Sequence, residues 1–400
     1  MERCPMPKQA SCKSKKLGRA ILIIPSEAIS AWIEKGEVVD RYFNPKDQFQ
    51  RVYFLLRKGD APDLTALKRM SGNATIKIRH YDTGTLNFIK SLGWKDPFFG
   101  ATVKRIIKNL PSRDIDIIRI IGADLNLVIG NRIARELNAH SIVSLHKDYE
   151  LALSDRPSRI RERLKKVALT RVFNIEIPAA DYIWVVYSSI GEFLSKKGIS
   201  NWELVPNLIN SRIARKKTWS SSGSLRMICV SKFDEVKDPR EIVKALVGLD
   251  NFYLVIVGDG PLFSEVKHLI RSLDLVESVI LLGNISNDDL LKYLANSDLC
   301  LLHSAAREFS KVFIEASLTG LPIIMNQSPN KSNPDYAGLP VVWVNGNSIS
   351  YSFAIRKYMK DRATLDKNGK LMANLVFRNF DPNAIEEMQG NLYHKLICGP

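Results

Sequence analysis

A glycine-rich turn is the first feature of the sequence with residues suited to ligand binding. Gly258 and Gly260 stand in the run Val-Gly-Asp-Gly-Pro, residues 257–261, between an apolar stretch and a helical pattern. Glycines at such a point let a ligand approach the backbone, and the N-terminus of the following helix favours negative charge. A tight turn without a ligand explains the same glycines, so both interpretations stay open.

A pair of lysines follows another apolar run in the same half. Lys232 and Lys237 lie in the segment VSKFDEVKDP, directly after residues 225–230. The carboxyl ends of parallel strands are where α/β folds bind ligands. Two ammonium groups there could neutralise a diphosphate and stabilise it as a leaving group. The alternative is a solvated loop with ordinary surface lysines.

A single glutamate stands within an apolar segment further along. Glu315 follows the apolar residues 312–314 and belongs to residues 306–324, which run from a strand through a loop into a short helix. An unpaired buried carboxylate is costly, so Glu315 needs a partner. The two hydroxyls of a ribose are one candidate, because a carboxylate can accept both hydrogen bonds. A salt bridge to a nearby lysine or arginine is the other.

Two segments of the first half could contact a substrate. His146 comes just after the apolar run 141–145, and a histidine at a strand end can donate to a substrate oxygen. A histidine with a purely structural partner is the alternative. Residues 31–45 mix charged and aromatic side chains around a glycine, and Lys35, Gly36 and Glu37 suit a loop that binds sugar or phosphate.

Other arrangements of reactive residues are poor candidates. Asp114 and Asp116 form an Asp-x-Asp pair, but Asp116 leads into an apolar strand, so we expect no metal site there. No group of cysteines and histidines has the spacing of a zinc site. The sequence also lacks a Gly-x4-Gly-Lys-Ser/Thr phosphate loop and a Gly-x-Ser-x-Gly nucleophile turn. The segments described above therefore remain the candidates.

Short apolar runs alternate with amphipathic stretches along the chain, a pattern that predicts parallel sheets covered by helices. The expected strands of the first half are residues 20–24, 52–56, 75–78, 116–121, 141–145 and 182–186. Those of the second half are residues 225–230, 253–257, 279–282, 299–302, 322–325 and 341–344.

Helical patterns separate these runs, for example over residues 126–137 and 161–173. Pro261 suits a first helical position, and Gly320 suits a helix end. One apolar face of the helix after Pro261 combines Leu262, Val266, Leu269 and Leu273.

The pattern breaks in the polar, serine-rich residues 210–224, which we interpret as a linker. A chain of 400 residues also exceeds the usual size of a single core. We therefore expect a basic tail over residues 1–18 and two facing Rossmann-like α/β domains over residues 19–215 and 216–382, with a deep cleft between them. A helix over residues 383–400 would follow.

The charge of the chain is uneven. Residues 1–220 hold 39 lysines and arginines against 22 aspartates and glutamates, whereas the remainder is nearly neutral. The excess positive charge of residues 1–220 would attract an anionic membrane surface, a phosphate-bearing acceptor or nucleic acid. A merely soluble basic surface is the alternative. No apolar run reaches the roughly 18 residues of a membrane-spanning helix, and five scattered cysteines suit a reducing cytosol.

Taken in order, these segments resemble glycosyltransferase family 4, the retaining enzymes of the GT-B fold. The second half resembles the family over about residues 225–325, through VSKFDEVKDP, LVIVGDGPL, VILLGNIS and NSDLCLLHSAAREFSKVFIEASLTGLPII. The first half resembles it more loosely, through SLHKDY, ADYIWVVYSS and ELVPNLIN. The final segment resembles the family's last helix, which returns to the first domain.

The resemblance implies that the second domain binds the donor, a nucleotide-diphosphate sugar. Lys232 and Lys237 would hold the diphosphate, and Glu315 would bind the nucleotide ribose. Asn284 and Ile285 would lie near the base. The other donor-binding positions are a turn glycine and the start of a helix: Gly258, Ser310, Lys311 and Val312.

The resemblance also implies how the first domain contributes. His146 would face the donor sugar as a catalytic residue, and the loop of Lys35, Gly36 and Glu37 would border the acceptor and the phosphates. Neither a metal nor a cofactor would be needed, because lysines and backbone N–H groups would hold the diphosphate.

Two residues depart from the family pattern of two glutamates separated by seven residues. Counting back from Glu315 places Arg307 at the first position, with Glu308 beside it. A one-residue slip of the loop 305–311 would let Glu308 act as the catalytic carboxylate, with Arg307 pointing outward or toward phosphate. A strict register would put Arg307 in the sugar pocket, where it would favour a donor with a carboxylate. Loss of activity is the third option.

The resemblance therefore implies a retaining, metal-independent glycosyltransferase with a glycan or lipid-linked acceptor of the cell-envelope or exopolysaccharide type. We expect a cytoplasmic location, with peripheral binding at the inner face of an anionic membrane. A GT-B binding or regulatory protein without turnover is one alternative, motivated by Arg307. A nucleic-acid-binding protein is the other, but the sequence carries no recognisable module of that class.

Overall fold

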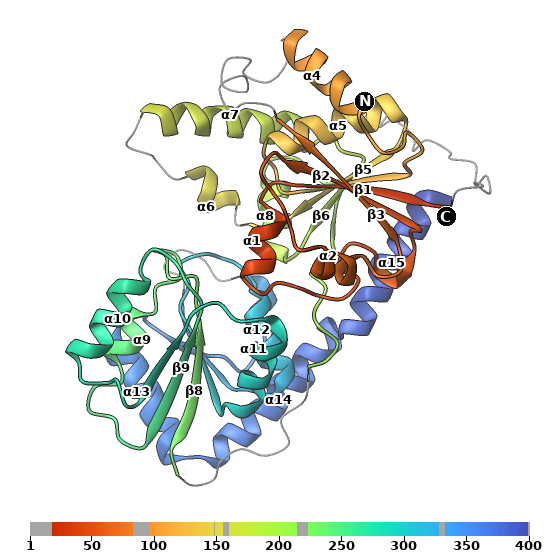
Figure 1. Ribbon diagram of the computed structural model, residues 1–400. Helices are drawn as coiled ribbons and strands as arrows, with labels where there is room; N and C mark the ends of the chain where they lie inside the picture. Colours follow the sequence, from red (N-terminus) through yellow and green to blue (C-terminus); the bar gives the residue numbers. More distant parts are fainter. Residues whose placement is uncertain are drawn as a thin grey trace.

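Two α/β domains, each built on a parallel sheet, make up the chain (Figure 1). The computed structural model describes residues 18–82, 97–147, 149–154, 160–213, 223–327 and 333–398. The first sheet has the order β3-β2-β1-β4-β5-β6-β7. Its strands are β1 (Ala20–Pro25), β2 (Arg51–Arg57), β3 (Thr75–Tyr81), β4 (Ile117–Ile121), β5 (His140–Leu145), β6 (Tyr182–Val185) and β7 (Trp202–Leu204).

The second sheet has the order β10-β9-β8-β11-β12-β13, and its paired strands are again parallel. Its strands are β8 (Leu225–Val230), β9 (Phe252–Val257), β10 (Val279–Leu282), β11 (Leu299–Leu302), β12 (Ile323–Asn326) and β13 (Val342–Val344). In both sheets the first strand of the domain lies inside the sheet, so a topological switch point lies beside β1 and beside β8.

Burial on both faces explains why these apolar runs form parallel strands. Every residue of β1 and of β4 is buried, as expected for strands covered by helices on both sides. Each strand expected from the sequence is present, with bounds that differ by a few residues at most. The sequence did not predict β7, because its three residues are too short a run to show a period.

Helices connect the strands in both domains. Those of the first domain are α1 (Ile29–Glu34), η1 (Pro45–Asp47), α2 (Leu64–Ser71), α4 (Pro97–Lys108), α5 (Leu125–Leu137), α6 (Tyr149–Ser154), α7 (Ile160–Glu176) and α8 (Ser188–Lys196). Those that follow are α9 (Arg240–Lys244), α10 (Phe263–Ser272), α11 (Asn287–Asn296), α12 (Lys311–Thr319), η2 (Pro334–Tyr336), α13 (Ser348–Lys360), α14 (Ala363–Phe380) and α15 (Pro382–Cys398).

The predicted start of α10 at Pro261 is wrong by two residues. The helix begins at Phe263, whose N–H bonds to the carbonyl of Gly260 at 3.0 Å and so holds Pro261 in the preceding turn. The predicted apolar face is confirmed. Val266 is fully buried, and the same core cluster is contacted by Leu262, Leu269 and Leu273.

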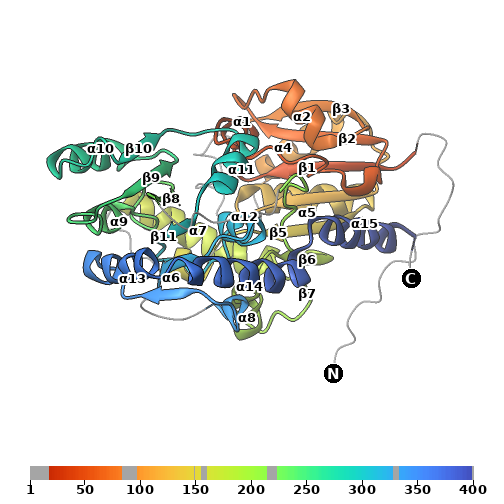
Figure 2. The ribbon, with the colours of Figure 1, turned by 90° about the horizontal axis from the view of Figure 1, so that it is seen from below.

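The chain returns to the first domain through its last helix. α14 packs beside α12 in the second domain, whereas α15 lies along the first domain (Figures 1 and 2). Arg41 donates two hydrogen bonds to Glu386 of α15, at 2.6 and 2.8 Å. Tyr393 of α15 is fully buried against Phe49 and Trp184. α15 therefore belongs to the core of the first domain.

The two sheets divide the chain between β7 and β8. The predicted boundary between residues 215 and 216, and residues 1–17 of the predicted tail, lie outside the described residues. The largest cluster of buried apolar side chains contains residues of both domains, among them Ile209 and Phe309. No helix in the described ranges is long and apolar enough to cross a bilayer.

Candidate active site

A cavity of about 540 Å³ lies between the domains, where the carboxyl ends of the two sheets face each other. The carboxyl end of β5 supplies His146, and those of β8 and β9 supply Lys232 and Gly258. All fourteen candidate residues from the sequence line this cavity: Lys35, Gly36, Glu37, His146, Lys232, Lys237, Gly258, Asn284, Ile285, Glu308, Ser310, Lys311, Val312 and Glu315.

The glycine turn after β9 is explained by packing as well as by its place in the cavity. Gly258 and Gly260 have φ values of 125° and 159°, which favour glycine. A Cβ atom at Gly258 would lie 1.8 Å from the carbonyl oxygen of Ser231, and one at Gly260 would lie 2.0 Å from that of Lys232. The turn must therefore lie directly against the loop that carries the lysine pair.

The loop after β8 is held by local hydrogen bonds that fix the direction of its lysines. Asp234 accepts from the N–H groups of Val236 at 3.0 Å and Lys237 at 2.8 Å, and the hydroxyl of Ser231 donates to the carbonyl of Lys237. The Lys237 ammonium forms an ion pair with Glu308 across the cavity wall. Lys232 lines the same cavity.

The N-terminus of α12 adds a second positive feature to this wall. Ser310 caps the helix by accepting the N–H of Phe313 at 3.2 Å, and Gly320 ends it with φ 97°, as predicted. Ser310, Lys311 and Val312 line the cavity at the start of the helix. Unsatisfied N–H groups and the helix dipole favour an anion at such a position.

Glu315 is buried in α12 with only 1% of its surface exposed. Its Oε1 atom accepts a hydrogen bond from Asn287 at 2.9 Å and lies 3.6 Å from the ammonium of Lys311. The carboxylate thus has the partners that its burial requires, and it still lines the cavity. Both interpretations drawn from the sequence remain compatible with this arrangement.

Asn287 is a residue of the site that the sequence did not indicate. It stands at the first position of α11, where Ser286 provides the cap. Its backbone N–H bonds to the carbonyl of Gly36 in the first domain at 3.0 Å, while its side chain bonds to Glu315. A Cβ atom at Gly36 would lie 2.0 Å from the carbonyl of Ile285. The loop 35–37 and the helix that carries Glu315 therefore meet through Asn287.

His146 is neutral in this environment. Burial lowers the pKa of its imidazole to about 3, and the nearby charges of Arg119 and Lys147 act in the same direction. A hydrogen bond with Asn207 opposes this shift. The Nε2 atom is buried without a hydrogen-bond partner among the described residues. A neutral imidazole with a free nitrogen beside the cavity suits hydrogen bonding to a substrate hydroxyl.

Arg307 and Glu308 point to opposite sides of their loop. Glu308 lines the cavity, whereas Arg307 forms ion pairs with Glu150 at 2.9 Å and with Glu192 at 3.1 Å in the first domain. Arg307 thus does not line the cavity, where the strict-register alternative would place it. The two glutamates bond Nη1 and Nη2 of the guanidinium outside the cavity, an arrangement compatible with the slipped loop.

Other residues of the first domain also line the cavity, among them Glu27, Trp32 and Lys147. Glu27 and Lys147 form an ion pair at 2.5 Å, and Trp32 packs against the rings of Tyr42 and Phe43. Burial opposes the ionisation of Glu27, but hydrogen bonds and charges from Lys147 outweigh it, so the pKa of this carboxyl lies below its usual value. The pair joins loops after β1 and β5 that are far apart in the sequence, so no local pattern indicates it.

The Asp-x-Asp pair has structural contacts. Asp116 accepts the N–H of Ala20 at 2.8 Å, and Asp114 pairs with Arg51 at 3.1 Å. In the described ranges, no group of three or more histidine, cysteine, aspartate or glutamate side chains is placed to hold a metal ion.

Residues 210–372 match the protein family described as glycosyl transferases group 1. The chain is 35% identical over 113 residues to the N-acetyl-alpha-D-glucosaminyl L-malate synthase of Bacillus anthracis, a match that covers 27% of this chain and 29% of that protein. It is 29% identical over 160 residues to N-acetylgalactosamine-N,N'-diacetylbacillosaminyl-diphospho-undecaprenol 4-alpha-N-acetylgalactosaminyltransferase of Campylobacter jejuni, covering 39% of this chain and 42% of that protein. The matches thus span less than half of these relatives.

Solved structures match over nearly the whole chain. Sucrose-phosphate synthase from Thermosynechococcus elongatus superposes with a TM-score of 0.72 at 15% identity, covering 96% of this chain and all of that one. The Anabaena protein HepE in complex with UDP superposes with a TM-score of 0.69 at 15% identity, covering 94% of this chain and all of that one. At this identity the likeness concerns the fold. The chain therefore has the GT-B fold of two facing Rossmann-like domains, and its residues 210–372 match the model of the glycosyl transferases group 1 family.

Proposed function

We propose that the protein is a retaining glycosyltransferase of family 4, which moves a sugar from a nucleotide-diphosphate sugar to a glycan or lipid-linked acceptor. The observation that carries this proposal is the cavity between the domains. Two lysines and a helix N-terminus occupy one wall, and a neutral histidine occupies the other. The first set suits a diphosphate and the second suits a sugar.

The second domain would hold the donor. Lys232, Lys237 and the N-terminus of α12 would surround the diphosphate with positive charge, which becomes more favourable as the leaving group gains charge. Glu315 would accept hydrogen bonds from the ribose hydroxyls, and the loop of Asn284 and Ile285 would border the base. The lysines and N–H groups supply the neutralisation that a metal ion provides elsewhere, so we propose a reaction without metal or cofactor.

The first domain would hold the acceptor and complete the reaction centre. An acceptor hydroxyl oxygen would bond to the anomeric carbon of the sugar, on the face from which the diphosphate departs. The electron pair of the broken bond stays on the diphosphate, and the acceptor proton is released. His146 would hydrogen-bond a sugar hydroxyl from its buried Nε2, and Glu308 would reach the sugar from the opposite wall.

Two of the relatives support an acceptor of the cell envelope. One of them, by its name, acts on a diphospho-undecaprenol-linked sugar, and another is an alpha-monoglucosyldiacylglycerol synthase, 23% identical over 128 residues. Several solved structures of the same fold contain UDP or a UDP-sugar. We therefore propose a lipid-linked or exopolysaccharide-type acceptor, reached from the cytoplasmic face of a membrane.

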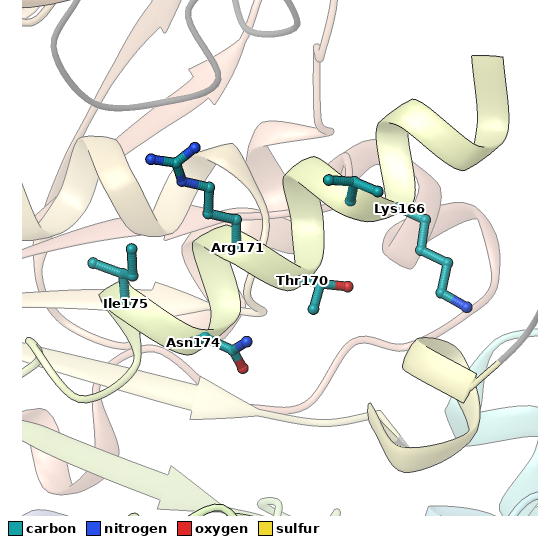
Figure 3. Close-up of a pocket in the computed structure, with 6 residues that line it drawn as sticks. Lys166, Thr170, Arg171, Asn174 and Ile175 are labelled. Carbon is teal, nitrogen blue, oxygen red and sulfur yellow. The ribbon is translucent and has the colours of Figure 1, made fainter. Parts of the chain in front are cut away.

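The surface of α7 supports peripheral binding to an anionic membrane. An open pocket of about 450 Å³ beside this helix is lined by basic, apolar and uncharged polar side chains, which Figure 3 draws as sticks: Lys166, Val167, Thr170, Arg171, Asn174 and Ile175. Val167 and Ile175 are 59% and 48% exposed. Basic side chains beside exposed apolar ones suit an acidic lipid surface.

The proposal is tested by donor binding followed by transfer. A panel of nucleotide sugars is first screened for an increase in the melting temperature. A donor at about 100 times its dissociation constant should stabilise the folded state by roughly 2.7 kcal/mol. Transfer from that donor to lipid-linked acceptors is then measured with EDTA present, and NMR gives the anomeric configuration of the product.

Each outcome separates the alternatives. Binding with neither transfer nor hydrolysis would favour a regulatory protein, and the absence of any nucleotide-sugar binding would overturn the proposal. A product with the inverted anomeric configuration would contradict only the retaining mechanism. Activity that is lost in EDTA and restored by a divalent cation would contradict metal independence alone.

A further inference from the structure

The loop before α12 is attached to the other domain through Arg307. The guanidinium bonds to Glu150 of α6 through Nη1 and to Glu192 of α8 through Nη2. Only 10% of the Arg307 side chain is exposed, against 31% and 45% for its two partners. One cation thus holds two carboxylates of the first domain at a partly buried boundary, where charge-assisted bonds are stronger than at an exposed surface.

The backbone of the same residue is held as well. The carbonyl of Arg307 accepts the hydroxyl of Ser189 at 2.8 Å and the side-chain amide of Asn333 at 3.0 Å. Asp335 accepts the backbone N–H of Ser188 at 2.7 Å. The start of α8 and the segment around η2 therefore enclose the loop from both domains, and the loop can adopt few alternative positions.

The next residue faces the opposite way, into the cavity. The carboxylate of Glu308 pairs with Lys237, and its backbone carbonyl accepts the hydroxyl of Tyr336 at 2.9 Å. Because consecutive side chains share one backbone segment, a displacement of Arg307 must displace Glu308. The Glu150 and Glu192 contacts on one side, together with the backbone bonds of the loop, therefore position the carboxylate on the other.

We infer that Arg307 is a positioning residue, which clamps its loop to the first domain and so places the carboxylate of Glu308 on Lys237 in the cavity. The planar guanidinium is suited to two carboxylates at once, whereas a lysine ammonium offers no such fork. Since both partners belong to the first domain, Glu308 takes this place only while the domains are together. The role of Glu308 in turnover rests on the proposed function. The placement of its carboxylate by Arg307 does not.

The kinetic test asks whether Arg307 acts through Glu308. Arg307→Ala should lower kcat about tenfold or more, with the KM of the donor changed less than threefold. The kcat of Arg307→Lys should lie between those of Arg307→Ala and the wild type. The double variant Glu150→Gln with Glu192→Gln should reproduce the loss of kcat seen in Arg307→Ala. In a Glu308→Gln background, Arg307→Ala should lower kcat by less than a further factor of two. A purely structural role predicts the opposite, because the two losses would then multiply.

A second test needs no turnover, and so separates this inference from the proposed function. The reaction of Lys237 with an amine-reactive reagent is followed by mass spectrometry, with Lys232 as the internal reference. Arg307→Ala and Arg307→Lys should speed the labelling of Lys237 severalfold, because the carboxylate of Glu308 would no longer pair with the ammonium of Lys237. Arg69→Ala is the matched control, because it breaks another ion pair between the domains, Arg69 with Asp288 at 3.1 Å, away from this loop.

The outcomes are distinct. Faster labelling in both Arg307 variants but not in Arg69→Ala supports the clamp, even if no donor is ever turned over. Unchanged labelling in a folded Arg307 variant would overturn it, as would losses in kcat that multiply with those of Glu308→Gln.

Discussion

The imidazole of His146 is held neutral by burial and by neighbouring cations, with consequences for stability in acid. Its pKa is about 3 in the folded state and near 6.5 when exposed. The unfolded chain therefore binds the proton first, and stability that is fully present above pH 6.5 is lost as the pH falls toward 3. As the pH is lowered from about 6.5 to 4, the melting temperature of His146→Gln, whose side chain cannot titrate, should fall less than that of the wild type. Equal slopes in the two proteins would show that the imidazole is not held neutral.

The lysine pair gives the second prediction at this scale. Lys232→Ala and Lys237→Ala should each lower kcat/KM for the donor by roughly 10- to 150-fold, because each removes a charge-assisted contact worth about 1.5–3 kcal/mol. The matched control is Lys244→Ala, whose ammonium forms an exposed surface pair with Glu241 at 2.7 Å. The measurement is steady-state kinetics on folded variants. Unchanged kcat/KM in both cleft variants would remove the pair from the donor site.

The sequence placed the candidate residues well, but not their partners. Lys232, Gly258 and His146 follow apolar runs, and in parallel sheets the carboxyl ends of the strands gather at one edge, so position along the chain predicts position in space. The partners of Arg307 in α6 and α8 are more than a hundred residues away. No local pattern records such contacts, and the same is true of Asn287 beside Gly36.

At the scale of elements, the loops after α1 and after α8 offer a matched pair of glycines. Gly36 and Gly198 both have φ 76°, so an alanine at either adds strain of about 1–2 kcal/mol. A Cβ atom at Gly36 would also meet Ile285 at 2.0 Å, whereas one at Gly198 meets nothing within 4 Å. Gly36→Ala should therefore weaken donor binding at least tenfold, in addition to lowering the melting temperature. Gly198→Ala should change only the melting temperature.

Calorimetric titration of the donor into both glycine variants distinguishes the two effects. Equal affinities would show that the contact between Gly36 and the second domain does not shape the donor site.

Strands were easier to predict than helix starts, for a physical reason. A buried parallel strand is apolar on both faces, so β1 or β11 appears as an uninterrupted run. The start of α10 depends instead on which N–H bonds to which carbonyl, and a bond to Gly260 shifts it beyond Pro261. β7 lies at the edge of its sheet with partly exposed residues, so it lacks the burial that marks the other strands.

For the whole molecule, the basic half predicts salt-sensitive binding to acidic membranes. The protein should sediment with liposomes that contain acidic lipid and dissociate as salt rises, because exposed charges are screened beyond about 8–10 Å at physiological ionic strength. Lys166→Glu with Arg171→Glu on α7 should weaken this binding. Lys292→Glu, at a position 73% exposed on the second domain, is the control. Binding that ignores salt, or that is lost equally in the control, would argue against this surface.

The contacts that join the domains beside the cavity include those of Gly36 with Asn287 and of Arg307 with its two glutamates. Neither of these contacts can persist while the domains move apart, so both must break whenever the cavity opens by separation of the domains. If release of a nucleotide from the proposed donor site requires this separation, turnover should fall in a viscous solvent. Weakening either contact would then shorten the residence of the product while making each encounter with a donor less productive.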